Sequence, residues 1–366
     1  MKTRFILIGY GWRADFFHRI AKELPEQFEI TAAVLRTEER AKEVGESKGV
    51  FATADLEVAL ATKPDFAVLC VPRAITAGYL ERLMEKQVLV LCETPPADSV
   101  EELNHLWEMK EKYQGRVQVA EQYFLQPLYA AILKVIEKDM LGEVSNMTLS
   151  ALHGYHAISI FRKVLGVGFE NCKIKGKKYV FPVVNTNGRA GFDRSGKVVD
   201  AERNVITLEF ESGKVAFLDF ASHQYFSHIR TRRLNVQGVQ GEINDMDVYY
   251  LDQRAATEAY PNGEYIPVKE TFNRIDFGPY NNDVPTHQGI MLGKEFLYEN
   301  PFYGARFNDD EIAMADCLVR MKHYVETGEE FYSLKDALQD AYLSILTYEV
   351  GENESVVYTE SQKFGK

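Results

Sequence analysis

The feature that most limits how this chain can fold is a set of short, wholly apolar runs that alternate with segments of helical periodicity. Residues 66–71 and 88–92 are two such runs, and proline follows each of them. A strand without polar residues has both faces covered, which requires a parallel sheet with helices on each side. The alternation extends from Arg4 to Ala120. It predicts a doubly wound, Rossmann-type α/β domain over residues 1–122.

The individual elements of this domain can be placed from the same pattern. Thr37 is the expected N-cap of a helix that opens with two glutamates, and Asp98 or Ser99 is the expected cap of another. The expected helices cover residues 12–24, 38 onward, 74–85 and the segment that ends at 113. The expected strands cover residues 4–8, 29–35, 66–71, 88–92 and 117–120.

A glycine turn stands between the first expected strand and the first expected helix. It reads Gly9-x-Gly11-x-x-Ala14. Gly9 permits a tight turn, Gly11 lets the backbone approach a pyrophosphate, and Ala14 allows close packing of helix on strand. The phosphates of a dinucleotide would rest on the helix N-terminus, where unpaired N–H groups and the helix dipole favour anions. The alternative is a glycine turn with a purely structural role. The strand–turn–helix context favours the dinucleotide.

The end of the second strand bears on the choice between NAD and NADP. An acidic residue usually stands there to bind the ribose hydroxyls of NAD. In this chain Leu35 is followed by Arg36 and Thr37, with Arg40 one helical turn further on. Arginine suits the 2′-phosphate of NADP, so NADP is the preferred cofactor and NAD the alternative. Arg36 and Arg40 are otherwise simply exposed residues at a helix start.

The pattern changes after residue 122, which predicts a second domain over residues 123–366. Two-residue alternation favours an open, mostly antiparallel sheet with helices on one face. Helices are expected at 127–137, 309–327 and 334–350, and strands at 143–149, 206–210, 215–220 and 234–239, with a hairpin turn at 211–213. The aromatic-rich segment 272–303 is interpreted as a long loop that forms a lid or pocket wall, or merely covers the surface. Segment 188–198 is another loop expected to shape the pocket.

Composition excludes several classes of partner. Acidic residues outnumber basic ones by 54 to 42, for a net charge of -12, and nucleic-acid-binding proteins more often carry a basic face. No apolar run is long enough to cross a bilayer. The four cysteines are scattered and read as free thiols, which favours a cytoplasmic protein. The spacing of His153, His156, His223 and His228 fits no usual metal site.

Several motifs together resemble the Gfo/Idh/MocA family of glucose–fructose oxidoreductases and inositol dehydrogenases. Beside the glycine turn, they are residues 37–41, 92–95, 154–156, 165–166 and 233–243. The resemblance implies a dinucleotide-binding domain followed by a substrate domain. It further implies NAD(P)-dependent oxidation or reduction of sugars, cyclitols and related carbonyls, and a homodimer or homotetramer that forms contacts through the open sheet face.

The chain departs from the family pattern at the positions that usually carry the chemistry. The lysine of the family's Glu-Lys-Pro loop is replaced by Thr94, and the aspartate of its Gly-x-His-x-x-Asp segment by Ser159. A histidine common after the fourth strand corresponds to Thr76. Among the positions that usually carry ionisable catalytic groups, only His156 keeps one. His156 is therefore the predicted proton donor or acceptor. Alternatively, His156 stands at a helix start and only caps backbone groups.

These considerations define the expected site and function. Catalytic roles are predicted for His156, Tyr155, Thr94 and Tyr123. The predicted cofactor-binding residues are Gly9, Gly11, Trp12, Arg13, Ala14, Arg36, Thr37, Arg40, Val71, Pro72, Arg73, Glu93, Thr94 and Gln122. The leading hypothesis is hydride transfer between NAD(P) and a small carbonyl, imine or sugar-derived substrate. The alternatives are a lyase or glycosidase that oxidises its substrate transiently, and a catalytically silent dinucleotide sensor.

Overall fold

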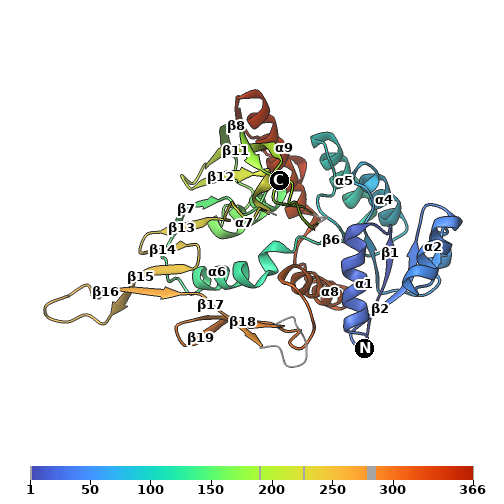
Figure 1. Ribbon diagram of the computed structural model, residues 1–366, viewed down its shortest axis with the longest axis horizontal. Coiled ribbons are helices and arrows are strands. Elements are labelled where there is room, and N and C mark those ends of the chain that lie inside the picture. Colours follow the sequence, from blue (N-terminus) through green and yellow to red (C-terminus); the bar gives the residue numbers. More distant parts are fainter. Residues whose placement is uncertain (1, 189–190, 226, 278–285, 366) are drawn as a thin grey trace.

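The N-terminal part of the chain forms the expected parallel sheet (Figure 1). The computed structural model describes residues 2–365 except 189–190, 226 and 278–285. Six parallel strands lie in the order β3-β2-β1-β4-β5-β6. Strands β2 and β3 extend the sheet on one side of β1, and β4, β5 and β6 extend it on the other side, so the strand order switches at β1 and β4. The strands are β1 (Thr3–Ile8), β2 (Phe28–Val34), β3 (Ala52–Thr53), β4 (Phe66–Leu69), β5 (Val90–Cys92) and β6 (Val117–Val119). The helices between them are α1 (Trp12–Glu23), α2 (Glu38–Lys48), α3 (Leu56–Leu60), α4 (Arg73–Glu85) and α5 (Val100–Tyr113).

Helix starts in this domain follow from side-chain caps. Thr37 accepts a hydrogen bond from the backbone N–H of Arg40 and so begins α2, as predicted. Of the two caps considered for α5, Ser99 is the one used, because its hydroxyl accepts from the backbone N–H of Glu102. Each cap satisfies an N–H group that the helix itself leaves unpaired.

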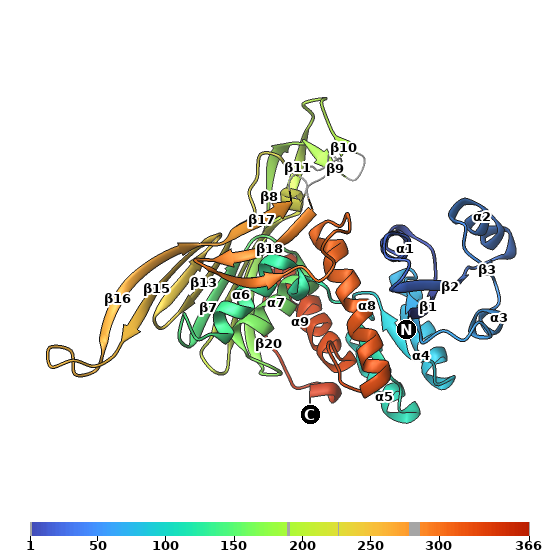
Figure 2. The ribbon, with the colours of Figure 1, turned by 90° about the horizontal axis from the view of Figure 1, so that it is seen from below.

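A second, larger sheet follows, as the alternation in the sequence indicated. Within the described residues it has nine strands in the order β16-β15-β14-β13-β7-β12-β11-β8-β20, all antiparallel except the β12–β7 pair. The strands are β7 (Val144–Leu149), β8 (Cys172–Val184), β11 (Val198–Phe210), β12 (Val215–Ala221), β13 (Leu234–Gly238), β14 (Gly241–Asn244), β15 (Asp247–Arg254), β16 (Glu264–Thr271) and β20 (Val356–Tyr358). Helices α6 (Pro127–Glu137), α7 (Gly154–Leu165) and α9 (Leu334–Asn353) lie to one side of this sheet (Figure 2). The fold class predicted from the sequence is confirmed.

Two interpretations of loops were wrong where the structure describes them. Segment 272–303 contains three strands, β17 (Asn273–Phe277), β18 (Thr286–Leu292) and β19 (Glu295–Glu299), which form a small antiparallel sheet beside α6. Segment 188–198 takes part in a short hairpin of β9 (Asn187–Gly188) and β10 (Gly191–Phe192). Parts of both segments, 189–190 and 278–285, lie outside the described residues. No described residue of segments 188–198 and 272–303 lines either of the two large cavities described below.

Helix α8 (Asp309–Thr327), from the C-terminal part of the chain, packs against the N-terminal sheet. Phe5 and Leu7 of β1 point to the sheet face that α1 and α8 cover, whereas Ile6 and Ile8 point to the opposite face. Ile312 and Leu318 of α8 are fully buried in the same cluster as Phe5. The N-terminal sheet is therefore covered in part by a helix from the other end of the chain. The domain boundary at residues 122 and 123 stays a prediction.

The remaining turns are short. They are η1 (Tyr123–Leu125), which links β6 to α6, η2 (Ser222–Tyr225), which follows β12, and η3 (Lys363–Gly365) near the C-terminus.

Candidate functional site

The turn between β1 and α1 has the geometry that the glycines predicted. Gly9 has φ +87°, and a Cβ atom there would lie 2.5 Å from the carbonyl oxygen of Cys70 at the end of β4. Gly11 is the N-cap of α1, carries no side-chain cap, and has open space where a Cβ would stand. Ala14 is fully buried against the sheet. The start of α1 therefore has no side-chain cap and opens on free space beside Gly11, which is the arrangement that binds a phosphate.

A cleft lies at the carboxyl ends of the parallel strands. It consists of two adjoining cavities of about 590 Å³ and 490 Å³, both lined by Trp12, Arg13, His153, His156 and Tyr348. The larger cavity extends along the ends of β4 and β5 towards α9, and the smaller one reaches the second sheet. Ligands of doubly wound sheets bind in this position, outside the carboxyl ends of the strands.

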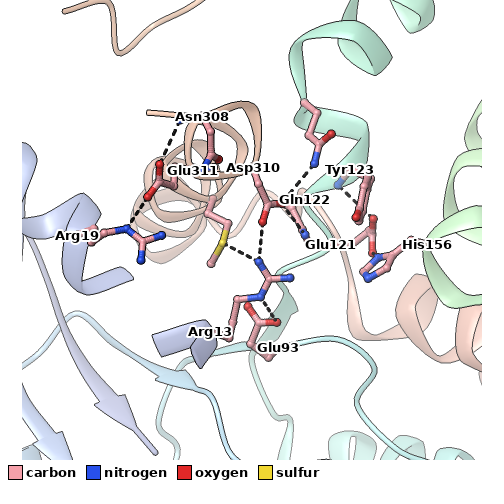
Figure 3. Close-up of polar contacts among 12 residues, drawn as sticks. Arg13, Arg19, Glu93, Glu121, Gln122, Tyr123, His156, Asn308, Asp310 and Glu311 are labelled. Carbon is pink, nitrogen blue, oxygen red and sulfur yellow. Dashed lines mark hydrogen bonds and ion pairs between the residues drawn. The ribbon is translucent and has the colours of Figure 1, made fainter. Parts of the chain in front are cut away.

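His156 is held by a buried carboxylate. Its Nδ1 lies 2.7 Å from Oε2 of Glu121, and the Glu121 side chain is fully buried just after β6. The other carboxylate oxygen of Glu121 accepts a hydrogen bond from the backbone N–H of Tyr123 at 3.1 Å. The rings of Tyr123 and His156 lie 4.5 Å apart, and Figure 3 shows this cluster. The imidazole is thus fixed at Nδ1, while its ring lines the cleft.

A second histidine lies beside the first but has a different electrostatic environment. His153 is the N-cap residue of α7, and its ring centroid is 5.4 Å from that of His156. Burial, together with the charges of His156 and Arg73, lowers the pKa of His153 to about 4. His153 is therefore neutral near pH 7. Of the two histidines in the cleft, His156 is the one with an acidic partner.

Arg13 of α1 lines the cleft and forms ion pairs with residues after β5 and in α8. Its guanidinium lies 3.4 Å from Glu93 after β5 and 2.8 Å from Asp310 in the first turn of α8. Asp310 also accepts hydrogen bonds from the amides of Gln122 at 2.9 Å and Gln126 at 3.3 Å (Figure 3). Burial raises the pKa of Glu93, and the charge of Arg13 opposes that rise. This network joins α1, β5 and α8.

The structure brings most of the predicted residues to the cleft. Trp12, Arg13, Val71, Arg73, Glu93, Thr94, Tyr123, Tyr155 and His156 line one or both cavities. Gln122 lies beneath the cleft, 1% exposed, with its amide on Asp310. Pro72 is the exposed N-cap residue of α4.

The predicted adenosine-binding residues lie apart from the cleft, after β2. Arg36, Thr37 and Arg40 are all exposed. Thr37 caps α2, and Arg40 forms an ion pair with Glu43 at 2.5 Å. Arg36 has no carboxylate partner within the part of the chain that the structure describes. It is the freer of the two arginines to meet a phosphate.

Tyr155 is placed in a way that does not suit proton transfer. Its hydroxyl is buried and has no hydrogen-bond partner among the described residues. Burial raises the pKa of Tyr155 well above its ordinary value, and the nearby charges of Asp340 and Glu121 add to the rise. The ring lies against His156, with centroids 5.6 Å apart. This arrangement favours a packing role over the catalytic one predicted.

The residues that replace the family's catalytic groups make local contacts. Thr76 is buried and its hydroxyl donates to the carbonyl oxygen of Pro72 at 3.4 Å. The Ser159 hydroxyl donates to the carbonyl oxygen of His156 at 2.9 Å. Thr94 alone of the three lines the cleft. Among the predicted catalytic residues, His156, Thr94 and Tyr123 are therefore the ones whose polar groups are placed at the cleft.

Two carboxylates of the site were missed in the sequence. Glu121 directly precedes Gln122 and Tyr123, which were predicted, and a charged residue immediately after a buried strand is a signal that could have been used. Asp310 carried no such signal, because its partners Arg13 and Gln122 lie 297 and 188 positions away in the chain.

The comparisons with known proteins agree with this geometry. Residues 3–121 match the family model described as an oxidoreductase family with an NAD-binding Rossmann fold, GFO_IDH_MocA. The N-terminal third of the chain is thus similar to that family of oxidoreductases. A segment of 108 residues is 25% identical to the YteT protein of Bacillus subtilis; it covers 29% of this chain and 25% of YteT.

Solved structures of similar fold span the whole chain. An oxidoreductase from Agrobacterium radiobacter, in complex with NAD⁺, L-tartaric acid and magnesium, has a TM-score of 0.65 and 17% identity, with 98% of each chain covered. Levoglucosan dehydrogenase, in complex with NADH and levoglucosan, has a TM-score of 0.66 and 16% identity, covering 98% of this chain and all of the other. A myo-inositol dehydrogenase from Corynebacterium glutamicum has a TM-score of 0.63 and 14% identity, with coverage of 98% and 99%. At these identities the likeness shows that the chain shares the overall fold of these structures across both of its sheets.

Two further observations concern membrane spans and metal sites. Over the described residues, no helix combines the length and apolar character needed to cross a membrane. In the same part of the chain, no group of three or more histidine, cysteine, aspartate or glutamate side chains is arranged to hold a metal ion. The four cysteines are free thiols.

Proposed function

We propose that this protein is an NAD(P)-dependent oxidoreductase that transfers hydride to or from a small carbonyl, imine or sugar-derived substrate. The observation that carries the proposal is the pair of His156 and Glu121, which lies in a cleft at the carboxyl ends of the parallel strands. The open glycine turn at the start of α1 lies on the same edge of the sheet.

The residues around that turn fit a dinucleotide. A Cβ at Gly11 would enter the open space in front of the α1 N-terminus, which supports close approach of a pyrophosphate there. Arg36 would meet the 2′-phosphate of NADP, and Arg13, Thr94 and His156 would border the nicotinamide. When bound, the dinucleotide supplies or accepts the hydride. The preference for NADP over NAD belongs to this proposal.

His156 supplies the proton that accompanies hydride transfer. Its Nδ1–H donates to Glu121, which fixes the tautomer and orientation of the ring and leaves Nε2 as the proton-exchanging atom. In the reducing direction, protonated Nε2 gives its proton to the developing alkoxide or amine. In the oxidising direction, neutral Nε2 removes the hydroxyl proton. Glu121 acts through His156 and is a positioning residue.

Neighbouring hydroxyls have a supporting role. Thr94 lines the cavity, where its hydroxyl can donate a hydrogen bond but cannot act as a base near neutral pH. Burial, together with the nearby charge of Asp310, raises the pKa of Tyr123 to about 12. Tyr123 therefore keeps its proton and packs its ring against His156.

The cofactor assignment can be tested by titrating NADPH and NADH into the purified chain by calorimetry. For Arg36→Ala we expect NADPH binding at least about tenfold weaker, because a charge-assisted contact to phosphate is lost, with NADH binding little changed. Lys42→Ala is the matched control, since it removes an exposed positive charge on the same helix at a position with no predicted cofactor role. If wild-type protein bound neither cofactor, the oxidoreductase proposal would be wrong.

The catalytic assignment can be tested with NADPH and a panel of small aldehydes, ketones, imines and oxidised sugars. His156→Ala should lower kcat about 100-fold or more, which is the usual contribution of a general acid. Glu121→Gln should lower kcat at least about tenfold without weakening NADPH binding. His105→Ala, an exposed histidine on α5, is the control. Unchanged turnover in His156→Ala would refute the proton-transfer role.

The same assay separates the alternatives. Product formed without net consumption of NADPH would indicate transient oxidation followed by elimination or hydrolysis. Saturable cofactor binding with no turnover across the panel would indicate a sensor.

We also propose that two copies associate through the open face of the second sheet, as a homodimer or within a homotetramer. Tyr179, Val205 and Phe217 point to that face and are 42%, 40% and 39% exposed. Contiguous apolar surface of this kind favours an interface. Light scattering on the purified chain would reveal the assembly, and Phe217→Glu should dissociate it.

A further inference from the structure

A separate, smaller cavity lies on the open face of the second sheet, away from the candidate active site. Its volume is about 170 Å³, and its walls come from β8, β11, β12 and the segment that follows η2. The charged residues in its lining are Arg203, Arg230, Arg233 and His223, and Phe181 and Val183 supply apolar wall. A cluster of three arginines is unusual in a chain whose net charge is -12.

The positive charge in this cavity is only partly balanced. Arg203 and Arg233 share one carboxylate, that of Asp219, at 2.5 and 2.6 Å from Arg203 and 3.0 Å from Arg233. The guanidinium of Arg230 donates to the carbonyl oxygen of Ile229 at 2.9 Å, and no carboxylate in the described part of the chain pairs with it. Three guanidinium groups therefore face one acidic side chain.

An orphaned polar atom lies in the same cavity. Nδ1 of His223 is buried and has no hydrogen-bond partner among the described residues. The neighbouring Gln224 differs, because its amide bonds the backbone of Ala221 and Thr231 and the hydroxyl of Ser150. Buried polar groups in proteins are almost always paired, so an unpaired one commonly indicates an absent ligand or ion. The ring of His223 can offer an N–H to that ligand.

The size and charge of the cavity define the ligand. A cavity of about 150 Å³ accommodates benzene, so 170 Å³ is sufficient for a small oxyanion with a short substituent. Guanidinium forks match the paired oxygens of phosphate, which is why arginine predominates in phosphate sites. We propose that this cavity binds a phosphate group, either inorganic phosphate or a small phosphate monoester, through Arg203, Arg230, Arg233 and His223.

The site shares a wall with the candidate active site. Along η2, Ser222 and Tyr225 line the cleft that contains His156, whereas His223 and Gln224 line the phosphate cavity. One turn of 3₁₀-helix therefore separates the two ligands. The phosphate site is nevertheless independent of the proposed oxidoreductase activity, because none of its lining residues contributes to the cleft.

The proposal can be tested by calorimetry with the full chain at constant ionic strength. Inorganic phosphate and glycerol phosphate are the two probes, titrated in separate experiments, and they distinguish a free phosphate from a monoester. Arg230→Ala is the main variant, because Arg230 is exposed and its side chain bonds only its own neighbour's backbone, so the fold should be unaffected. His223→Ala is the second variant. Arg254→Ala removes the same charge from the far end of β15 and serves as the control.

We expect one of the two probes to bind at millimolar concentration or below, and binding to weaken at least about tenfold in Arg230→Ala and in His223→Ala. Arg254→Ala should bind like wild type. Arg36→Ala should also bind normally, which excludes the dinucleotide site as the source of the signal. Absence of binding by both probes, or binding that both cavity variants retain, would overturn the proposal. So would a signal that Arg36→Ala abolishes. A dimer in which an acidic side chain of the second copy fills the cavity would show no phosphate binding, and would equally refute it.

Discussion

The two glycines of the β1–α1 turn should respond differently to the same substitution. At Gly9, alanine would have to adopt φ +87°, and its Cβ would lie 2.5 Å from the carbonyl oxygen of Cys70. At Gly11, φ is not positive and no atom lies within 4 Å of the added Cβ. Gly9 is thus required by the fold itself, whereas we expect Gly11 to be required by the pyrophosphate of a bound dinucleotide.

The loss of folding free energy in Gly9→Ala can be estimated from its backbone conformation and its contact with Cys70. A non-glycine residue in the left-handed region costs roughly 1–2 kcal/mol. Relieving a contact with a backbone carbonyl adds roughly 1–3 kcal/mol, as overpacking usually does. A total of roughly 3 kcal/mol would lower the midpoint of thermal unfolding by roughly 6–12 °C. Gly11→Ala loses only a favourable N-cap residue, at most about 1 kcal/mol.

Thermal unfolding followed by circular dichroism, together with NADPH titration, provides the assay. Gly9→Ala should unfold at clearly lower temperature. Gly11→Ala should unfold close to wild type yet bind NADPH at least about tenfold more weakly, because its methyl group occupies the phosphate approach. Two results would refute this reasoning: a Gly9→Ala variant as stable as Gly11→Ala, or a Gly11→Ala variant with wild-type affinity.

Three further predictions concern single side chains. Tyr155→Phe removes a buried hydroxyl without a partner, so calorimetric unfolding should show a variant as stable as wild type or about 1 kcal/mol more stable, with turnover unchanged; a large loss of turnover would restore its catalytic role. His153 binds its proton near pH 6.5 when unfolded but only near pH 4 when folded, because of burial; stability should therefore fall by up to roughly 3 kcal/mol as pH drops from 6.5 to 4, and urea titrations should show a smaller loss in His153→Asn. Ser99→Ala removes the cap of α5 and should cost about 1 kcal/mol in the same titrations, whereas an unchanged midpoint would mean that the cap contributes nothing.

The N-terminal half could be predicted closely because its signals are local. Strands buried on both faces appear as apolar runs, so Phe66–Leu69 and Val90–Cys92 were found with errors of two residues at most at either end. The cap at Thr37 and the conformation of Gly9 also depend on neighbours in the chain. Local rules were sufficient for these elements.

The outer strands of the second domain could not be predicted, because exposed strands carry weak patterns. β16 alternates between exposed and half-exposed residues, so no apolar face marks it as a strand. The strands of 272–303 likewise form a sheet by pairing with each other and packing beside α6. The pairing of Glu121 with His156 joins residues 35 positions apart on different elements, and only the tertiary structure reveals it.

The position of α8 has a consequence for the order in which the protein is made. The N-terminal sheet leaves the ribosome first, but the helix that covers one of its faces ends at Thr327, about 200 residues later. At roughly 5–20 residues per second, that helix follows about 10–40 seconds behind the last strand of the sheet. Until then Phe5 and Leu7 lack part of their covering. We therefore expect the N-terminal domain to reach its full stability only after the chain has been synthesised as far as Thr327.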